Sequence, residues 1–144
     1  MLILSSAAGE AASPQIRNAG TIAGNLCQRP FCWYFRSANF TCLRKGGQVC
    51  YTVTGDSRFH AILGAGPSYI VHPSDTAPAL VALGGQIKIG GPEGEKTIPL
   101  EKFFLLPSVD YKRENILTAG EIVTEIIVPA PKSGSKGFYH KVRE

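Results

Sequence analysis

Hydrophobic and polar residues alternate most clearly in the second half of the chain. Ile87 and Ile89 have polar neighbours, as in a strand with one buried face. The Gly-Pro-Glu-Gly-Glu sequence at 91–95 predicts a hairpin turn, 97–100 the returning strand, and 121–128 a further strand that ends at Pro-Ala-Pro. Weaker local patterns predict four further short elements: strands over 60–64, 69–72 and 138–142, and one helical turn over 100–104.

Two helices are expected earlier in the chain. Residues 5–12 are small and tolerate helix, and we expect Pro14 to close this helix. Ser74 is a good N-cap for a second helix because its hydroxyl can accept from amides of the first turn. Gly84 and Gly85 are expected to end that helix. Helix followed by antiparallel hairpins favours an α+β fold.

Two stretches show no regular period. Residues 15–26 are rich in Gly and Asn, which favour tight turns, so we expect a loop there. Residues 27–58 are rich in Cys, Arg, Gly and aromatic side chains. A long irregular stretch inside a compact domain is usually functional or cross-linked, and a bound cluster would supply order here.

The composition is that of one ordinary globular domain. The 144 residues are 44% apolar and 18% charged, which permits a core and disfavours disorder. No apolar run reaches the length of a transmembrane helix, and the start lacks the basic region of a signal peptide. We expect a cytoplasmic protein, or a periplasmic one if a partner carries the export signal.

The basic charge is concentrated in one segment. Residues 28–60 contain five Lys or Arg and one acid, which gives 5 − 1 = +4 and equals the net charge of the whole chain. The remaining residues contain ten of each sign. Such a patch can bind nucleic acid or another anion, and it can offset the negative charge of a thiolate-bound cluster.

The same segment contains all four cysteines within 24 residues, namely Cys27, Cys32, Cys42 and Cys50. In a chain without a signal peptide, this density favours metal or cluster ligation over disulfides. The gaps are C-x4-C, C-x9-C and C-x7-C. The absence of a C-x2-C pair disfavours a zinc finger, and ferredoxin spacing is also absent.

The sequence RNAGTIAGN at 17–25 has features that suit an anion. Gly20 and Gly24 let the backbone approach a pyrophosphate without a Cβ in the way, and Thr21 and Asn25 can add side-chain donors. It is neither a Walker A loop nor GxGxxG. Taken alone, it could equally be a structural turn.

With its flanks, SPQIRNAGTIAGNL is similar to the second flavin motif of the FAD-binding subunits of the xanthine dehydrogenase and carbon monoxide dehydrogenase family. Ala23 stands where that family usually has Gly, which puts a methyl group near the cofactor. The resemblance implies FAD contacts from seven residues: Arg17, Asn18, Thr21, Ile22, Ala23, Gly24 and Asn25.

Two later segments also resemble this family. In HPSDTAPALVALGGQI at 72–87, Ser74 and Asp75 match residues that help to hold the ribityl or pyrophosphate part of FAD. A capped amphipathic helix is the plain alternative. In GEIVTEIIVPAP and KGFYHKVRE, Glu121 and Val123 would lie near the adenosine and Lys141 near the isoalloxazine, where it could stabilise the anionic reduced flavin. Two edge strands with exposed charges would explain these segments equally well.

The cysteine segment resembles an insert in one branch of the family, which includes 4-hydroxybenzoyl-CoA reductase and periplasmic aldehyde oxidoreductase types. The insert there holds an additional [4Fe–4S] cluster near the flavin. Ser68 stands where relatives usually have a downstream cysteine. Three alternatives therefore stay open: Cys27 is the fourth ligand beside Cys32, Cys42 and Cys50, Ser68 ligates through oxygen, or the site is degraded.

The resemblance implies an α+β, FAD-binding PCMH-type domain, of which residues 1–144 form a part that includes the second subdomain. An antiparallel sheet with flanking helices would bear a Cys-rich insert over 27–68. The family's upstream flavin motif and C-terminal domain are expected to be absent, so we expect an oxidoreductase subunit that is inactive alone.

The implied function is electron transfer within a molybdopterin-dependent hydroxylase or dehydrogenase. The implied partners are a molybdopterin-binding large subunit, a [2Fe–2S] small subunit and an external electron acceptor, without nucleic acid. The alternative from another class is a non-enzymatic iron–sulfur or zinc module that binds nucleic acid. It would use the basic and aromatic residues Arg29, Phe31, Trp33, Tyr34, Phe35, Arg36, Arg44 and Lys45.

Overall fold

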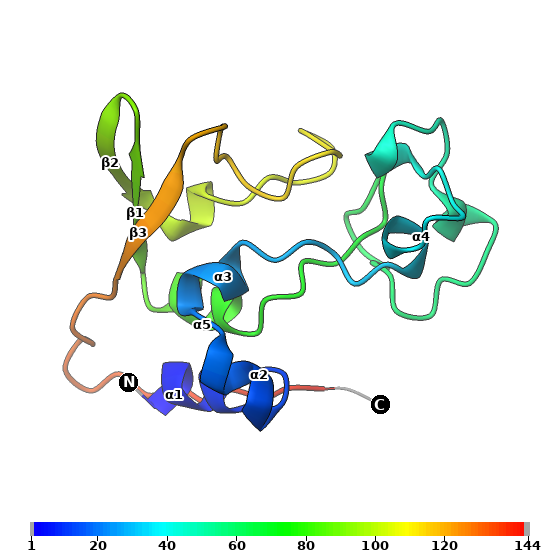
Figure 1. Ribbon diagram of the computed structural model, residues 1–144. Helices are drawn as coiled ribbons and strands as arrows, with labels where there is room; N and C mark the ends of the chain where they lie inside the picture. The colour runs from blue at the N-terminus through cyan, green and yellow to red at the C-terminus, as the bar shows by residue number, and fades with distance from the viewer. Residues whose placement is uncertain (1, 143–144) are drawn as a thin grey trace. The chain divides into compact units, whose positions relative to one another are not determined.

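The computed structural model describes residues 2–142, which divide into two compact units. The first unit contains the chain up to Cys27, Ser74–Phe103, and the chain from Leu117 onward. The second contains Gln28–Pro73 and Phe104–Ile116. Figure 1 shows the sheet and the labelled helices α1, α2, α3 and α5 of the first unit, and α4 in the second.

A three-stranded antiparallel sheet forms one layer of the first unit (Figure 1). Its strands are β1 (Gln86–Gly91), β2 (Gly94–Pro99) and β3 (Ile122–Ile127), in the order β2-β1-β3. The predicted hairpin and the predicted strand that ends before Pro-Ala-Pro are therefore confirmed, and the fold is mixed α+β.

The register of the sheet explains its alternating sequence. Ile87 lies opposite Ile98 on β2 and Ile126 on β3, and both Ile87 and Ile89 are buried. The intervening Lys88 is opposite Glu125, and their side chains form an ion pair at 2.9 Å. The period of two thus gives the sheet one apolar face and one charged face.

Two helices of the first unit pack against each other. α5 (Thr76–Ala82) packs against α1 (Leu2–Gly9), and their small alanines permit close contact. Ser74 Oγ accepts a hydrogen bond from Ala77 N at 3.0 Å, as predicted for a capping residue. After α5, Gly84 has φ of +69°, a left-handed conformation that ends the helix and favours glycine.

The prediction of a loop over 15–26 is wrong, because α2 (Pro14–Ala19) and α3 (Ile22–Leu26) occupy it. Ser13 Oγ accepts from Ile16 N at 3.4 Å, and Thr21 Oγ1 accepts from Gly24 N at 2.9 Å. Pro14 begins α2 rather than closing the preceding helix, since proline suits the first helical position. These caps outweigh the low helix propensity of the Gly and Asn residues.

The second unit consists of single turns joined by irregular chain. Its turns are α4 (Trp33–Arg36), the 3-10 turn η1 (Leu43–Lys45) and the 3-10 turn η2 (Tyr51–Val53). The strands predicted over 60–64 and 69–72 are wrong, although Ala61 N donates to Tyr69 O at 2.9 Å. Two runs this short, separated by Gly and Pro, pair at this point without forming a ladder.

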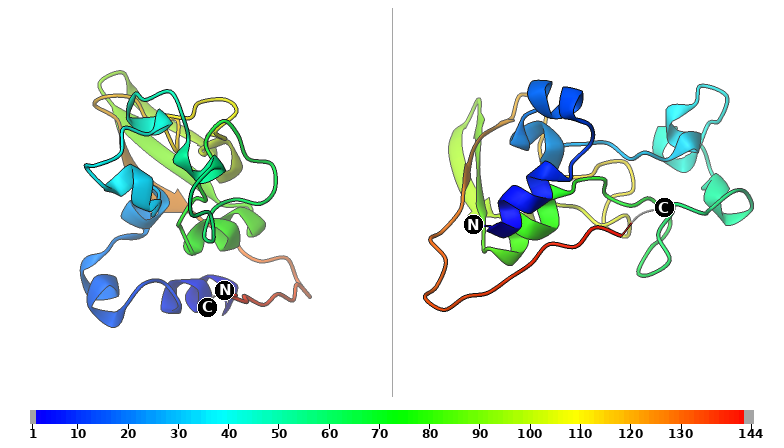
Figure 2. Two further views of the ribbon diagram at one scale, coloured as in Figure 1. Left: turned by 90° about the vertical axis from the view of Figure 1, so that its right-hand side faces the viewer. Right: turned by 90° about the horizontal axis from the view of Figure 1, so that it is seen from below.

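The strand predicted over 138–142 is also wrong. This segment is irregular, and Lys141 Nζ donates to Glu10 O at 3.0 Å. Nearby, Gly137 lies so close to Ile3 that a Cβ on the glycine would be 2.6 Å from Ile3 Cδ1. Figure 2 shows this part of the chain, in red, running beside α1. The alternating apolar residues of the segment, Phe138 and Val142, are exposed, so they do not form the buried face of a strand.

Each unit has its own buried residues. In the first, Leu26, Leu80, Leu100 and Phe103 are fully buried, and one further helical turn, η3 (Leu100–Lys102), contributes to this core. In the second, the buried side chains are mostly polar or sulfur-containing, as described below. Within residues 2–142, no helix has the length and apolar content that are needed to cross a bilayer.

Candidate functional site

Asn25 joins the first of the three flavin-like motifs, residues 17–25, to the second, residues 72–87. Its Oδ1 accepts hydrogen bonds from Ser74 Oγ and from Thr76 Oγ1, both at 2.6 Å, although Ser74 is 49 residues away in sequence. Ser74 and Thr76 are buried, with 6% and 2% of their surface exposed. An acceptor that serves two buried hydroxyls fixes the end of α3 against the start of α5. No feature of the sequence indicated that Thr76 belongs to this site.

Asp75, the residue after Ser74, is joined to the third flavin-like motif, which consists of residues 120–131 and 136–144. Lys141 Nζ lies 2.8 Å from Asp75 Oδ1, and Tyr139 Oη donates to the same oxygen at 3.5 Å. Partial burial raises the pKa of Tyr139, and the negative charge of Asp75 raises it further. The structure thus brings Asn25, Ser74, Asp75 and Lys141 together. Arg143, in the same motif, lies outside the described residues.

The exposed turn between α2 and α3 contains the remaining residues of the first motif. Asn18 and Ile22 are exposed, and Thr21 and Gly24 are held by the cap of α3. A Cβ at Gly24 would lie 3.1 Å from Thr21 Oγ1, so glycine keeps this turn open. The methyl group of Ala23 is half-buried.

Arg17 has a structural contact in addition to its expected role. Its Nη1 donates to Ala11 O at 2.7 Å and to Ala12 O at 3.4 Å. Ala12 has φ of +49°, which is rare for a residue with a Cβ. The arginine therefore supports the bend between α1 and α2.

Glu121 and Val123 lie at β3. A hydrogen bond from Lys96, together with one from Thr118 N, lowers the pKa of Glu121 to about 2. Val123 is opposite Ile89 in the sheet, and α3 packs against β3. The first motif and β3 are thus neighbours, while Glu121 itself is engaged with Lys96.

The second unit has one pocket whose lining includes three of the four cysteines, Cys32, Cys42 and Cys50, together with Ser68. All four cysteines are free thiols. Burial raises the pKa of Cys32, and the proximity of Cys42 and Cys50 raises it further. Cys27 belongs to the first unit, and burial raises the pKa of its thiol as well.

Within residues 2–142, no three Cys, His, Asp or Glu side chains lie close enough together to hold one metal ion. Three polar groups at the same pocket are buried without a hydrogen-bond partner among the described residues: Ser68 Oγ, Thr52 Oγ1, and Nε and Nη1 of Arg44. Buried polar groups normally have partners, so this concentration marks the pocket as a place for a polar or charged group.

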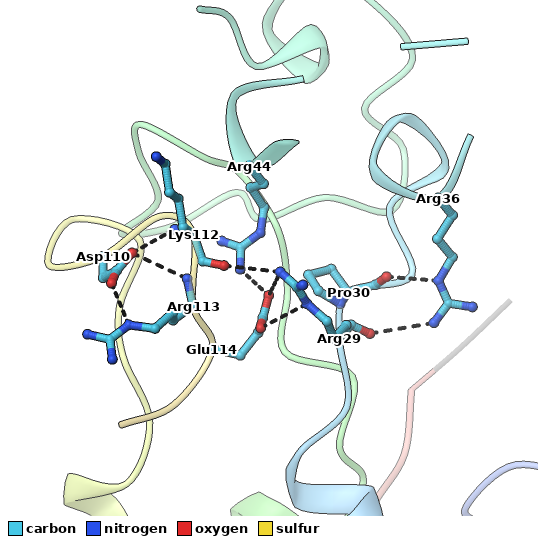
Figure 3. A network of polar contacts seen from close by, with 8 residues as sticks. All are labelled: Arg29, Pro30, Arg36, Arg44, Asp110, Lys112, Arg113 and Glu114. Atoms are coloured by element: carbon cyan, nitrogen blue, oxygen red, sulfur yellow. Dashed lines mark hydrogen bonds and ion pairs between the residues drawn. The ribbon is translucent and has the colours of Figure 1, made fainter. Parts of the chain in front are cut away.

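Arg44 is held in place by a buried ion pair that the sequence did not indicate (Figure 3). Its Nη2 pairs with Glu114 Oε1, and only 2% of the Arg44 side chain and 7% of the Glu114 side chain are exposed. Arg29 Nε binds the other carboxylate oxygen at 3.2 Å. Glu114 therefore anchors the segment Phe104–Ile116 to the cysteine segment.

Other cations of this segment contact aromatic rings and the backbone. The guanidinium of Arg29 lies 4.7 Å from the Phe35 ring centre, and that of Arg36 lies 4.2 Å from Phe31. Tyr34 is buried and stacks on Tyr51 at 5.8 Å. Two of the eight residues that the nucleic-acid alternative requires, Tyr34 and Arg44, are buried, whereas Arg29, Phe31 and Arg36 stay exposed.

Comparison with known protein families shows to which family the chain belongs. The family described as "FAD binding domain in molybdopterin dehydrogenase" matches residues 1–131, which is most of the chain. The chain therefore belongs to this family.

Individual relatives agree with this assignment. The chain is 38% identical over 145 residues to the aldehyde oxidoreductase FAD-binding subunit PaoB of Escherichia coli K12, with 99% of this chain and 45% of that protein covered. It is 26% identical to the carbon monoxide dehydrogenase medium chain of Hydrogenophaga pseudoflava, with 98% and 33% covered. It is 27% identical to the nicotinate dehydrogenase FAD-subunit of Eubacterium barkeri, with 94% and 31% covered. The chain thus spans less than half the length of these relatives.

Proposed function

We propose that this chain is the FAD-binding, electron-transfer part of a molybdopterin-dependent hydroxylase or dehydrogenase. The observation that supports the proposal most is the meeting of three separate flavin-like motifs at Asn25, Ser74, Asp75 and Lys141. Family membership supports the same conclusion. FAD would supply the redox chemistry when bound, and the residues of this chain would bind and orient it.

The described residues fit such a cofactor. The turn at Thr21 and Gly24 offers exposed backbone that a Cβ would obstruct, which suits a pyrophosphate. Asp75 keeps acceptor capacity beyond its contacts with Lys141 and Tyr139, because a carboxylate has about four lone-pair sites for hydroxyl donors. The ammonium of Lys141 would place a positive charge where a reduced flavin is negative.

The remaining residues that we expect near FAD would support the flavin turn or line the binding site. Arg17 would set the bend before the flavin turn, and Asn18, Ile22 and Ala23 would face the cofactor. Glu121 and Val123, at β3 beside α3, would bound the adenosine part.

We further propose that the cysteine pocket holds a [4Fe–4S] cluster. Cys32, Cys42 and Cys50 line one pocket, and a cluster has its irons spread over its corners, so it needs ligands spread around it. The fourth ligand comes from Cys27 or Ser68. When bound, the cluster would extend the electron path to FAD, and Arg44 would offset its negative charge.

The whole protein's partners follow from the same proposal. PaoB, the carbon monoxide dehydrogenase medium chain and the nicotinate dehydrogenase FAD-subunit are named as parts of oxidoreductases. We infer a molybdopterin-binding large subunit, where the organic substrate reacts, and a [2Fe–2S] small subunit. FAD would then pass the electrons to an external acceptor.

An anaerobic absorbance spectrum, with flavin and iron quantified on one sample, tests the proposal. We expect the flavin bands of oxidised FAD, and about four irons per chain after reconstitution with iron and sulfide. Asp75→Asn should reduce flavin content and leave iron unchanged, because Asp75 lies in the first unit. Salt-dependent binding of an oligonucleotide by a flavin-free, iron-free protein would contradict the proposal and favour the nucleic-acid module.

A further inference from the structure

Ser68 is an unusual residue among the buried side chains. Only 1% of its surface is exposed, and its hydroxyl oxygen has no hydrogen-bond partner among residues 2–142. A serine hydroxyl both donates and accepts, and a core seldom buries it with neither function satisfied. The hydroxyl is therefore available to a partner from a bound group.

The surroundings of Ser68 indicate what that group is. Ser68 lines the pocket with the thiols of Cys32, Cys42 and Cys50. The four side chains together provide three sulfurs and one oxygen, which is the number of protein ligands that a [4Fe–4S] cluster requires. All the residues that line the pocket belong to the second unit, whereas Cys27 is the last residue of the N-terminal segment of the first unit.

Positive charge lies beside the same four side chains. Arg44 lines the pocket, and its Nε and Nη1 are buried without partners while Nη2 pairs with Glu114. Thr52 Oγ1 is a further unpartnered hydroxyl in the lining. Such donors suit the sulfurs of an anionic cluster, because hydrogen bonds to sulfur and nearby charge tune the potential of a cluster.

We propose that Ser68 Oγ is the fourth ligand, so that the site holds a cluster bound by three thiolates and one alkoxide. This inference rests on the proposed cluster in the cysteine pocket. On ligation of an assembled cluster, each thiol and the Ser68 hydroxyl releases one proton to solvent, and one iron–sulfur or iron–oxygen bond replaces one iron–water bond per ligand, so no oxidation state changes. An alkoxide is a harder donor than a thiolate and favours ferric iron, so the midpoint potential should be lower than with a fourth cysteine.

The test compares four forms of the full chain after anaerobic reconstitution with equal amounts of ferrous and ferric iron and with sulfide, which together supply the mixed oxidation state of the cluster. The forms are the wild type, Ser68→Ala, Ser68→Cys and the control Ser135→Ala, which changes an exposed serine. Iron per chain, the EPR spectra of the oxidised and reduced states, and the midpoint potential are measured. Fluorescence of Trp33, in the same unit as Ser68, reports whether each apo-protein is folded.

We expect about four irons in the wild type and about three in Ser68→Ala, with the oxidised-state EPR signal of a three-iron cluster. Ser68→Cys should keep about four irons and have a higher midpoint potential than the wild type. Ser135→Ala should match the wild type in every measurement.

Two results would overturn the assignment of Ser68 while leaving the cluster proposal standing. One is a Ser68→Ala protein with the iron content and spectra of the wild type. The other is loss of iron from Cys27→Ala when Ser68→Ala loses none, which would make Cys27 the fourth ligand. A wild type and a Ser68→Cys variant that both bind no iron would instead overturn the cluster proposal itself, and the ligand assignment with it.

Discussion

Replacing Glu114 by alanine should destabilise the second unit strongly. The substitution leaves the guanidinium of Arg44 buried without its carboxylate partner, since only 2% of the Arg44 side chain is exposed. Removing one partner of a buried ion pair costs about 3–5 kcal/mol, a large part of the roughly 5–15 kcal/mol by which small domains are stable. Arg29, which is half exposed, recovers hydration and adds little to this cost.

Urea unfolding followed by Trp33 fluorescence measures the effect, because the single tryptophan of the chain lies in the same unit as Glu114. With a slope of about 1–3 kcal/mol per molar urea, the midpoint should fall by at least about 1 M. Asp110→Asn is the matched control, since Asp110 is in the same segment and pairs with the exposed Arg113. Its midpoint should stay near that of the wild type.

A double substitution separates the buried charge from the loss of packing. Glu114→Ala with Arg44→Met removes both charges, so the pair should be more stable than Glu114→Ala alone. A midpoint for Glu114→Ala equal to that of Asp110→Asn would refute the reasoning. So would a double variant whose loss equals the sum of the two single losses.

Three further predictions concern the first unit. Asn25→Ala should cost about 1–2 kcal/mol in thermal unfolding, because it removes the oxygen that accepts from two buried hydroxyls, while Asn25→Asp should retain most of the stability. Thr21→Ala removes the side-chain cap of α3 and should cost about 1 kcal/mol, whereas Thr21→Ser should remain near the wild type; equal stabilities would contradict the role of the cap. The pKa of Glu121 is lowered from 4.5 to about 2, so its contribution to stability is present above pH 4.5 and is lost as the pH falls toward 2. Lys96→Met should flatten that part of a pH–stability profile, and an unchanged slope would contradict the pairing.

The sequence predicted those features that depend on residues close together along the chain. The alternation at Ile87 and Ile89 and the glycines after α5 identified the sheet and the end of that helix. The caps of α2 and α3 were equally local, at Ser13 and Thr21, but the Gly and Asn content of the stretch favoured a loop. In the structure each of these helices has one side-chain capping hydrogen bond, and α3 also packs against α5 and β3, so caps and tertiary contacts together oppose the unfavourable propensity.

The contacts that build the candidate sites had no local signal. Asn25 meets Thr76 across 51 residues, and Arg44 meets Glu114 across 70. Periodicity describes which face of an element is buried, and it does not identify the partner of a polar side chain. The resemblance placed Asn25, Asp75 and Lys141 in one site, and the hydrogen bonds provide a physical reason for their proximity.

The most direct test of the account is a titration of the chain with FAD, followed by flavin absorbance, in the wild type and in Asp75→Asn. The account predicts saturable binding of about one FAD per chain. It also predicts at least about tenfold weaker binding for Asp75→Asn, because a hydrogen bond to a charged group contributes about 1.5–3 kcal/mol. Ser135→Ala, in the exposed tail, should bind as the wild type does. Equal affinity of Asp75→Asn and the wild type, or no saturable binding by either, would contradict the claim that these motifs meet to bind FAD.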